Sequence, residues 1–363
     1  MIKYCLNDIL PLIPEKQQCD LLDHLIKSTD GKIFVEREFS IAIRKKTEIH
    51  FKNGDLDEAS KLIQDVQIET FGSLERSYKV EYILFQMKVL LAKQEYVRTL
   101  LVSNKISRKH LDDEGFEVLK MDFYTLMIEY YINEGQFIDV SKSYKILYDF
   151  VNKIKSKIDK KEEIKAELVK NYTEVINKVN MYTLFENYVL YLSICPPELE
   201  TKNMLIELSM KYKKELDMNP ALLFIVTKKL SDDLVVINNE FFAPFAQFSL
   251  FFSKEKNQKL FRKYWIQHDL SLFEKFFSKM NLGKISAMTS INIDEIESEI
   301  SDMVINGYIF AKINRIEKTV NFRKKTDHHD VLNELTYDLE KMLKGVETTC
   351  HLINKEYLKY GIH

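Results

Sequence analysis

The sequence predicts a mostly α-helical protein in which helical hairpins stack into a TPR-like solenoid. The chain of 363 residues contains only 9 Gly and 6 Pro, far fewer than the roughly 7% and 5% of an average globular chain. A sheet protein with many tight turns needs more of both residues. Hydrophobic residues make up 45% and charged residues 30% of the chain, which is the balance of a folded protein rather than a disordered one.

A sequence repeat supports the stacked hairpins. The turn signals Gly54, Gln94 and Gly135 are 40 and 41 residues apart, and each lies between two segments with helical apolar periodicity. A single hairpin can bury its apolar face only by stacking on a neighbour. The repeats resemble degenerate tetratricopeptide units, although their period exceeds the ~34 residues of that repeat, and another α-α superhelix is the alternative. We expect the solenoid over residues 1–200.

Residues 201–325 are expected to form a second module, with a helical part at 201–280 and a winged helix at 281–325. The winged helix is indicated by the order helix, turn, helix and β-hairpin. These elements are expected at residues 284–290, 294–305, 308–313 and 319–322. In the longer helix one face is apolar; it consists of Ile296, Ile300, Met303 and Val304.

A long helix is predicted over residues 331–358, after a polar linker at 323–330. Its apolar residues are spaced alternately by three and four positions, which is the a/d pattern of a heptad seam. The seam consists of Leu332, Leu335, Leu339, Met342, Val346, Thr349 and Ile353. Because the helix follows a polar linker, we expect the preceding domain to leave the seam uncovered. Residues 326–363 are therefore predicted to form a bundle helix whose apolar seam residues bind a partner protein.

No catalytic or cofactor-binding pattern is recognisable in the sequence. The chain contains no glycine-rich phosphate loop, no GxSxG motif and no HExxH motif. The densest group of metal-ligand types is His328-His329-Asp330, but neighbouring side chains point in different directions, and a zinc site would need further ligands from elsewhere. We expect neither an enzyme nor a bound metal or cofactor.

The charge distribution bears on nucleic-acid partners. A net charge of −2 gives no general attraction to nucleic acid or to an anionic membrane. The helix at 294–305, which would enter the major groove in a DNA-binding winged helix, has five acidic residues and no basic one. DNA binding is not expected from such a helix, because phosphate neutralisation supplies most of the affinity. Arg315 and Lys318 in the predicted wing leave weak RNA contact as an alternative.

Cysteine usage and hydropathy indicate the compartment. The four cysteines lie far apart and form no CxxC pair, and no signal-peptide pattern precedes them. Reduced, structural thiols are typical of cytoplasmic and nuclear proteins. No stretch of 18 apolar residues occurs, so no membrane span is expected.

Several short segments are similar to segments of the PCI family, whose members are scaffold subunits of the proteasome lid, the COP9 signalosome and a translation initiation factor. They follow the order found in proteasome lid members, and they are residues 31–36, 54–59, 67–75, 96–99, 124–128, 304–315 and 349–356. The resemblance implies a helical-repeat solenoid followed by a PCI module with a winged helix and a long C-terminal helix.

The resemblance also implies a function. It indicates a non-catalytic subunit of a hetero-oligomer, the 26S proteasome lid, in ubiquitin-dependent protein degradation. Partners would be other PCI subunits of the lid, the lid deubiquitinase, the ATPase ring and core-particle subunits. Because PCI subunits join through their winged-helix sheets, we expect the hairpin residues to contact a neighbour; these are Ile309, Ala311, Ile313, Val320 and Phe322. A scaffold like subunit 4 of the COP9 signalosome, or an RNA-contacting initiation-factor subunit, is the alternative.

Overall fold

The structure, a computed structural model, describes residues 2–6, 10, 14–64, 66–72, 74–159, 172–173, 180–235, 248–252, 255–322 and 328–360. The chain divides into two compact units. The first comprises Met1–Ser231 and Pro244–Tyr264, and the second comprises Asp232–Ala243 and Trp265–His363.

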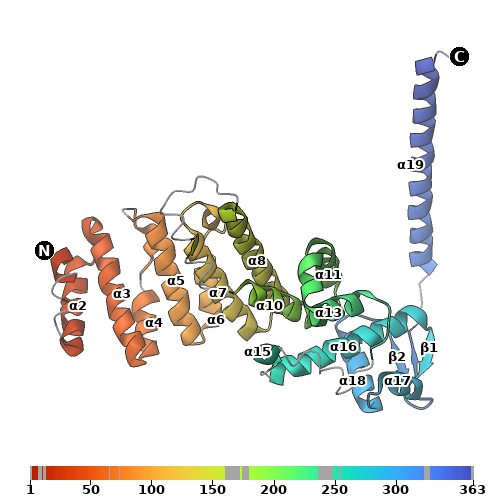
Figure 1. Ribbon diagram of the computed structural model, residues 1–363, viewed down its shortest axis with the longest axis horizontal. Coiled ribbons are helices and arrows are strands. Elements are labelled where there is room, and N and C mark those ends of the chain that lie inside the picture. Colours follow the sequence, from red (N-terminus) through yellow and green to blue (C-terminus); the bar gives the residue numbers. More distant parts are fainter. Residues whose placement is uncertain are drawn as a thin grey trace. The chain divides into compact units, whose positions relative to one another are not determined.

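The first unit begins with helical hairpins that follow one another along the chain (Figure 1). Its helices are α1 Ile2–Tyr4, α2 Glu15–Thr29, α3 Glu36–Asn53, α4 Leu56–Gln64, α5 Arg76–Ala92, α6 Tyr96–Ser103, α7 Glu117–Glu134 and α8 Phe137–Asp159. The helices pair as α3 with α4, α5 with α6 and α7 with α8, and α5 also contacts both α4 and α7. The predicted TPR-like solenoid is thereby confirmed.

The three predicted turn signals adopt the same left-handed backbone conformation. Gly54, Gln94 and Gly135 have φ values of 86°, 65° and 80°. At the first turn, the N–H groups of Gly54 and of the next residue donate to the carbonyls of Phe51 and His50. This Schellman motif satisfies carbonyl groups that the helix end leaves without partners. The same pair of hydrogen bonds recurs at Gln94 and Gly135, so the sequence repeat corresponds to a repeated turn.

A buried glutamine links neighbouring hairpins. Gln86 of α5 is 3% exposed, and its Nε2 donates to the carbonyl oxygens of Ile63, at 2.7 Å, and Val66, at 3.2 Å. These carbonyls lie at the C-terminal end of α4 and just beyond it, where a helix leaves carbonyl groups without intrahelical partners. Since Ile63 and Met87 are fully buried, apolar packing and side-chain hydrogen bonds together join the two hairpins.

The first unit continues through shorter helices. They are α10 Met181–Ser193, α11 Leu199–Lys211, α12 Lys213–Met218, α13 Pro220–Leu230, α15 Ser249–Phe252 and the start of α16 Glu255–Phe276. Asn219 caps α13, because its side-chain oxygen accepts the N–H of Ala221 at 3.3 Å, and Pro220 takes the first helical position, where no N–H is needed. Helices α11 to α13 belong to the same compact unit as the helices before them. The domain boundary expected at residue 200 stays a prediction.

The second unit contains a winged helix. Its elements are β1 Lys279–Asn281, α17 Leu282–Thr289, α18 Ile293–Ile305, β2 Lys312–Asn314 and β3 Thr319–Asn321. The strands form an antiparallel sheet in the order β1-β3-β2, in which Val320 of β3 lies opposite Met280 on one side and Ile313 on the other. The strand expected at 319–322 matches β3 closely, but of the strand expected at 308–313 only the last two residues belong to β2. The sequence misses β1, because a strand of three residues is too short to show the alternation on which a strand prediction rests.

The core of the winged helix lies between its helices and its sheet. Ile296, Ile300 and Met303 of α18 are fully buried in it, together with Ile285 of α17. The spacing places Val304 on this face, but Val304 is 38% exposed, because it lies about 100° further round the helix than Met303.

The chain ends in one long helix, α19 His328–Tyr360 (Figure 1). Its 33 residues span roughly 50 Å at 1.5 Å per residue. All residues from Val331 to Tyr360 are exposed. This helix confirms the predicted C-terminal element. Of the expected linker, residues 323–327 lie outside the described residues and 328–330 belong to α19.

Candidate interaction surfaces

An apolar stripe runs along α19. The predicted seam residues Leu332, Leu335, Leu339, Met342, Val346 and Ile353 are between 47% and 68% exposed. Because they recur every three or four positions, they lie on one side of the helix. Burying one such side chain contributes roughly 1.5–3 kcal/mol before ordering costs. The row therefore favours contact with other helices over exposure to water.

Further apolar side chains widen this row. Leu343 and Tyr357 each follow a seam residue by four positions and are 68% and 51% exposed, and the exposed Cys350 lies between them. A strict a/d pattern misses these residues because they occupy the e position of the heptad. A row of a, d and e positions is typical of a helix that packs in a bundle. The α19 stripe is defined as Leu332, Leu335, Leu339, Met342, Leu343, Val346, Cys350, Ile353 and Tyr357.

The opposite side of α19 is mostly polar, although it also carries the exposed Tyr337 and Leu358. Lys344 Nζ lies 2.7 Å from the Glu340 carboxylate, and His351 Nε2 lies 3.9 Å from that of Glu347. All four residues occupy the b and f positions of the heptad. Such i,i+4 pairs stabilise an exposed helix by about 0.2–0.5 kcal/mol each. The helix is therefore amphipathic, with its charged side in water and its stripe unpaired with any described element.

The hairpin residues predicted to bind a partner are core residues instead. Ile309, Ala311, Val320 and Phe322 are between 0% and 9% exposed, and Ile313 packs partly buried against the same core. The alternation along these strands does indicate one buried face, but that face packs on the helices of this winged helix. Their side chains are therefore unavailable to a neighbour. Since β3 is paired on both sides, the hairpin can meet a neighbour at the outer edge of β2, through the exposed side of its sheet, and in the wing.

Two ion pairs anchor the wing, residues 315–318. Arg315 donates to the carboxylate of Glu297 on α18, and Lys279 Nζ of β1 lies 3.0 Å from the carboxylate of Glu317. The RNA alternative rests partly on Arg315. Because its guanidinium is paired with a carboxylate, Arg315 is less able to neutralise a phosphate, and the ion pair disfavours that alternative.

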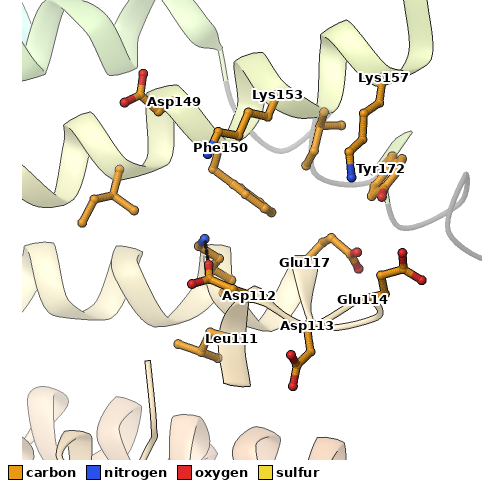
Figure 2. Close-up of a pocket in the computed structure, with 13 residues that line it drawn as sticks. Leu111, Asp112, Asp113, Glu114, Glu117, Asp149, Phe150, Lys153, Lys157 and Tyr172 are labelled. Carbon is orange, nitrogen blue, oxygen red and sulfur yellow. Dashed lines mark hydrogen bonds and ion pairs between the residues drawn. The ribbon is translucent and has the colours of Figure 1, made fainter. Parts of the chain in front are cut away.

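A charged cavity of about 440 Å³ is lined by residues of α7, α8 and the segment before α7 (Figure 2). Lys153 and Lys157 come from α8, whereas Asp113, Glu114 and Glu117 lie across from them. Most of the described residues that line the cavity are acidic or basic. Two of them, Lys120 and Asp112, form an ion pair with each other.

The described residues offer neither a metal-binding cluster nor a membrane-spanning helix. Within the described ranges, no cluster of three or more His, Cys, Asp or Glu side chains is arranged to hold a metal ion. The segment His328-His329-Asp330 begins α19. None of the described helices combines the length and the apolar composition that crossing a membrane requires.

Family models match three successive regions of the chain. The model described as PSMD12/CSN4, N-terminal, matches residues 1–157, the PCI domain model matches residues 257–324, and the model of the 26S proteasome regulatory subunit RPN5 C-terminal domain matches residues 329–358. The PCI match takes in most of α16 and the whole winged helix, and the third match coincides with α19 to within two residues at each end. The helical hairpins up to α8, the winged helix and α19 thus each lie almost wholly within a matched region, whereas α10 to α15 lie between the first two matches.

Similarity to curated proteins extends over nearly the whole chain. The chain is 25% identical over 370 residues to the 26S proteasome regulatory subunit RPN5 of Saccharomyces cerevisiae, covering 99% of this chain and 79% of that protein. It is 26% identical over 360 residues to the 26S proteasome non-ATPase regulatory subunit 12 of Dictyostelium discoideum, covering 96% and 73%. It is 26% identical over 373 residues to homolog A of that subunit in Arabidopsis thaliana, covering 93% and 78%. The predicted resemblance to proteasome lid members is confirmed.

Proposed function

We propose that this chain, similar throughout to RPN5 and subunit 12, is a non-catalytic scaffold subunit of the 26S proteasome lid that supports ubiquitin-dependent protein degradation. The α19 stripe carries this proposal, because it is an exposed apolar surface located where the RPN5 C-terminal model matches. A continuous exposed apolar surface marks a site of protein interaction. The chain would then hold other subunits in place rather than perform chemistry.

The α19 stripe would enter a bundle with helices of other lid subunits. Its residues lie on one side of a helix of 33 residues. Their burial would favour association, and part of this free energy would offset the cost of ordering the side chains. The proposed partners are other PCI subunits, the lid deubiquitinase, the ATPase ring and core-particle subunits. The proposed location is the cytoplasm and nucleus, where these assemblies work.

The winged helix would join a neighbouring PCI subunit through the outer edge of β2. Among the described strands, β2 pairs with β3 alone, so its other edge offers main-chain N–H and C=O groups. Such an edge accepts a further strand. In a contact of this kind, the main chain of β2 binds the neighbour, and the side chains of Ile309 and Val320 stay in the core.

Two observations weigh against the alternatives. The C-terminal family model and the relatives reported above carry proteasome names, which favours the proteasome over the COP9 signalosome. The acidic α18 and the pairing of Arg315 with Glu297 favour a protein partner over RNA, since RNA binding depends on free basic groups.

Affinity purification of the tagged native protein at moderate salt, followed by mass spectrometry, tests the proposal. We expect ATPase, core-particle and other PCI subunits of the proteasome in the eluate. A chain that ends at residue 327 is the matched control, because it lacks α19 and should recover these subunits poorly. Recovery of signalosome or ribosomal proteins without proteasome subunits would contradict the proposal.

A further inference from the structure

A second cavity, of about 330 Å³, lies in the first unit and is lined by residues of α8, α10, α12 and the start of α13. We call this cavity the α10 pocket. Its most deeply buried lining residues are Tyr148, Phe185 and Leu222, which are between 1% and 5% exposed. The volume is at the lower end of the range of about 300–1,000 Å³ that is typical of ligand pockets. The α10 pocket therefore suits one side chain or a small molecule.

Three aromatic rings line the α10 pocket. The ring centroids of Tyr148 and Phe185 are 5.2 Å apart, at an interplanar angle of 43°, so these two rings form a packed pair. The third ring belongs to Tyr182, which is 71% exposed and can adjust to a ligand without disturbing the core. Because the face of an aromatic ring is negative, rings in this arrangement favour an organic cation.

Two carboxylates line the same pocket. Glu186 follows Tyr182 by four positions, so the two side chains lie on one side of α10. Burial raises the pKa of the Glu186 carboxyl, and among the described residues no basic group pairs with it. Glu215 of α12 accepts a hydrogen bond of 3.5 Å from the hydroxyl of Tyr148. A carboxylate that is partly removed from water without a basic partner favours the binding of a cation.

The basic residue in the lining is Lys155. It is exposed on α8, and among the contacts that the structure describes it forms no ion pair with Glu186 or Glu215. Two carboxylates and one ammonium leave the lining with an excess of negative charge, which attracts a cation. The ligand should therefore combine a positive group with an apolar part that fits among the aromatic rings.

We propose that the α10 pocket binds the side chain of an arginine residue from a partner protein. A guanidinium group is planar, stacks on aromatic rings and pairs with carboxylates through two parallel hydrogen bonds, and its methylene stem is apolar. A lysine ammonium also pairs with a carboxylate but does not stack in this way. The inference goes beyond the proposed scaffold function, and it involves neither the α19 stripe nor the edge of β2.

An NMR titration of the full-length chain with isotope-labelled methionine methyl groups tests this inference. Met181 and Met218 line the α10 pocket, and methionines elsewhere in the chain are internal controls. The probes are arginine, lysine and the neutral citrulline, each blocked at both ends. We expect arginine to shift the two pocket resonances, lysine to bind several-fold more weakly, and citrulline to have no effect. Pocket resonances that do not move, or that respond equally to arginine and to either other probe, would overturn the inference.

A pair of substitutions at Tyr182 provides a matched test of the aromatic contact. Tyr182 is exposed, so both variants should fold. We expect Tyr182→Leu to lower the affinity for blocked arginine several-fold and Tyr182→Phe to retain it, because only the second variant keeps an aromatic ring. Equal affinities of the two variants would contradict the stacking argument.

The charge argument is tested by substitutions that keep the size of the side chain. Glu186→Gln should weaken arginine binding several-fold, whereas Glu129→Gln, at an exposed position of α7 outside the α10 pocket, should not. Lys155→Gln should strengthen binding, because it removes a positive charge from the lining. Loss of binding in the Lys155 variant would show that the pocket recognises an anionic group, and equal binding by the two glutamate variants would show that Glu186 does not contact the ligand.

Discussion

The main-chain N–H of Phe310 donates a hydrogen bond of 2.8 Å to the carboxylate of Glu274. This bond ties the segment that leads into β2 to α16, and thereby fixes the edge of the sheet on its supporting helix. A hydrogen bond to a charged acceptor contributes about 1.5–3 kcal/mol. The position of the proposed β2 contact therefore depends on a side chain 36 residues earlier in the chain.

The first prediction concerns this bond. Glu274→Ala should accelerate hydrogen exchange at the Phe310 amide by one order of magnitude or more, because about 1.4 kcal/mol corresponds to tenfold. Glu274→Gln should retain most of the protection, since its side-chain oxygen can accept the same bond. Exchange measured by NMR or mass spectrometry distinguishes the variants. Unchanged exchange at Phe310 in the alanine variant would show that the bond does not form in solution.

The second prediction concerns the one repeated turn without glycine. Gln94 adopts φ 65°, a conformation that costs an ordinary L-residue about 1–2 kcal/mol. Gln94→Gly should stabilise the solenoid by up to about 1 kcal/mol, because glycine removes this strain but has a more flexible unfolded state. The free energy is obtained from the midpoint of urea unfolding at constant slope.

A control for the turn is available one repeat earlier. Gly54 has φ 86°, so Gly54→Ala should destabilise the chain by about 1 kcal/mol. The two substitutions are thus expected to have opposite signs at the same position of the Schellman motif. A destabilising effect of Gln94→Gly would indicate that the Gln94 side chain makes a compensating contact.

The three repeated turns differ in how clearly the sequence predicts them. Gly54 and Gly135 indicate a helix end because glycine adopts positive φ without steric cost. Gln94 carries no such signal in its residue type, and only the regular spacing identifies it. The strand β1 Lys279–Asn281 is not predicted from the sequence. It forms because it pairs with β3, which is distant in the chain, and three residues alone show no strand pattern.

For the candidate surfaces, the sequence predicts which side chains share one side of an element but not whether that side is buried. The spacing of Leu335 and Leu339 predicts that they share one side of a helix, and the helix leaves that side exposed. The alternation at Ile309 and Ala311 equally predicts one apolar side, but the winged helix buries it. Periodicity gives the direction of side chains relative to one another; it does not give the identity of what they pack against. Leu343 is missed because a strict heptad seam excludes the e position.

The third prediction is a pH dependence. The hydrogen bond from Lys93, whose Nζ lies 2.7 Å from the carboxylate, is the main cause that lowers the pKa of Glu95. A lowered pKa in the folded state gives stability that is present above the unfolded pKa, about 4.3, and is lost as the pH falls through the folded value. The stability difference between the wild type and Glu95→Gln should therefore shrink between pH 6 and pH 3, as measured by urea unfolding.

Removing the basic partner provides the control. In a Lys93→Met background, Glu95→Gln should have a smaller effect that depends less on pH, because the largest interaction that favours the charged carboxylate is gone and only the pairing with Arg98 remains. The four variants form a double-mutant cycle. A pH-dependent difference that survives in the Lys93→Met background would assign the lowered pKa of Glu95 to another group.

The fourth prediction concerns the glycine inside α19. Gly345 lies in a helix interior, where glycine costs about 1 kcal/mol relative to alanine, and a Cβ atom added there meets no atom within 4 Å. Gly345→Ala should slow hydrogen exchange in α19 of the free chain. Because Gly345 occupies the g position, outside the α19 stripe, incorporation into the proteasome should stay normal. Reduced incorporation would show that a partner helix approaches closely at this residue.

The fifth prediction concerns the stripe itself. Leu335→Asp with Leu339→Asp places two charges where the proposed bundle would bury leucines, and it forfeits roughly 1.5–3 kcal/mol of burial per residue. Recovery of proteasome subunits with the tagged chain should fall at least a hundredfold. The isolated chain should stay folded, because both leucines are exposed, at 54% and 51%, and belong to no core. Circular dichroism of the purified variant checks this.

A matched pair on the polar side of α19 separates the stripe from the charge change. Asn333→Asp with Asn354→Asp also introduces two aspartates into the same helix and changes the net charge by the same amount, at exposed positions outside the α19 stripe. If the stripe is the binding surface, this control should co-purify with proteasome subunits as the wild type does, while the leucine variant does not. Equal recovery of both variants would mean that α19 is held by its charged side or not held at all, and the scaffold would then have to assemble through the edge of β2 alone.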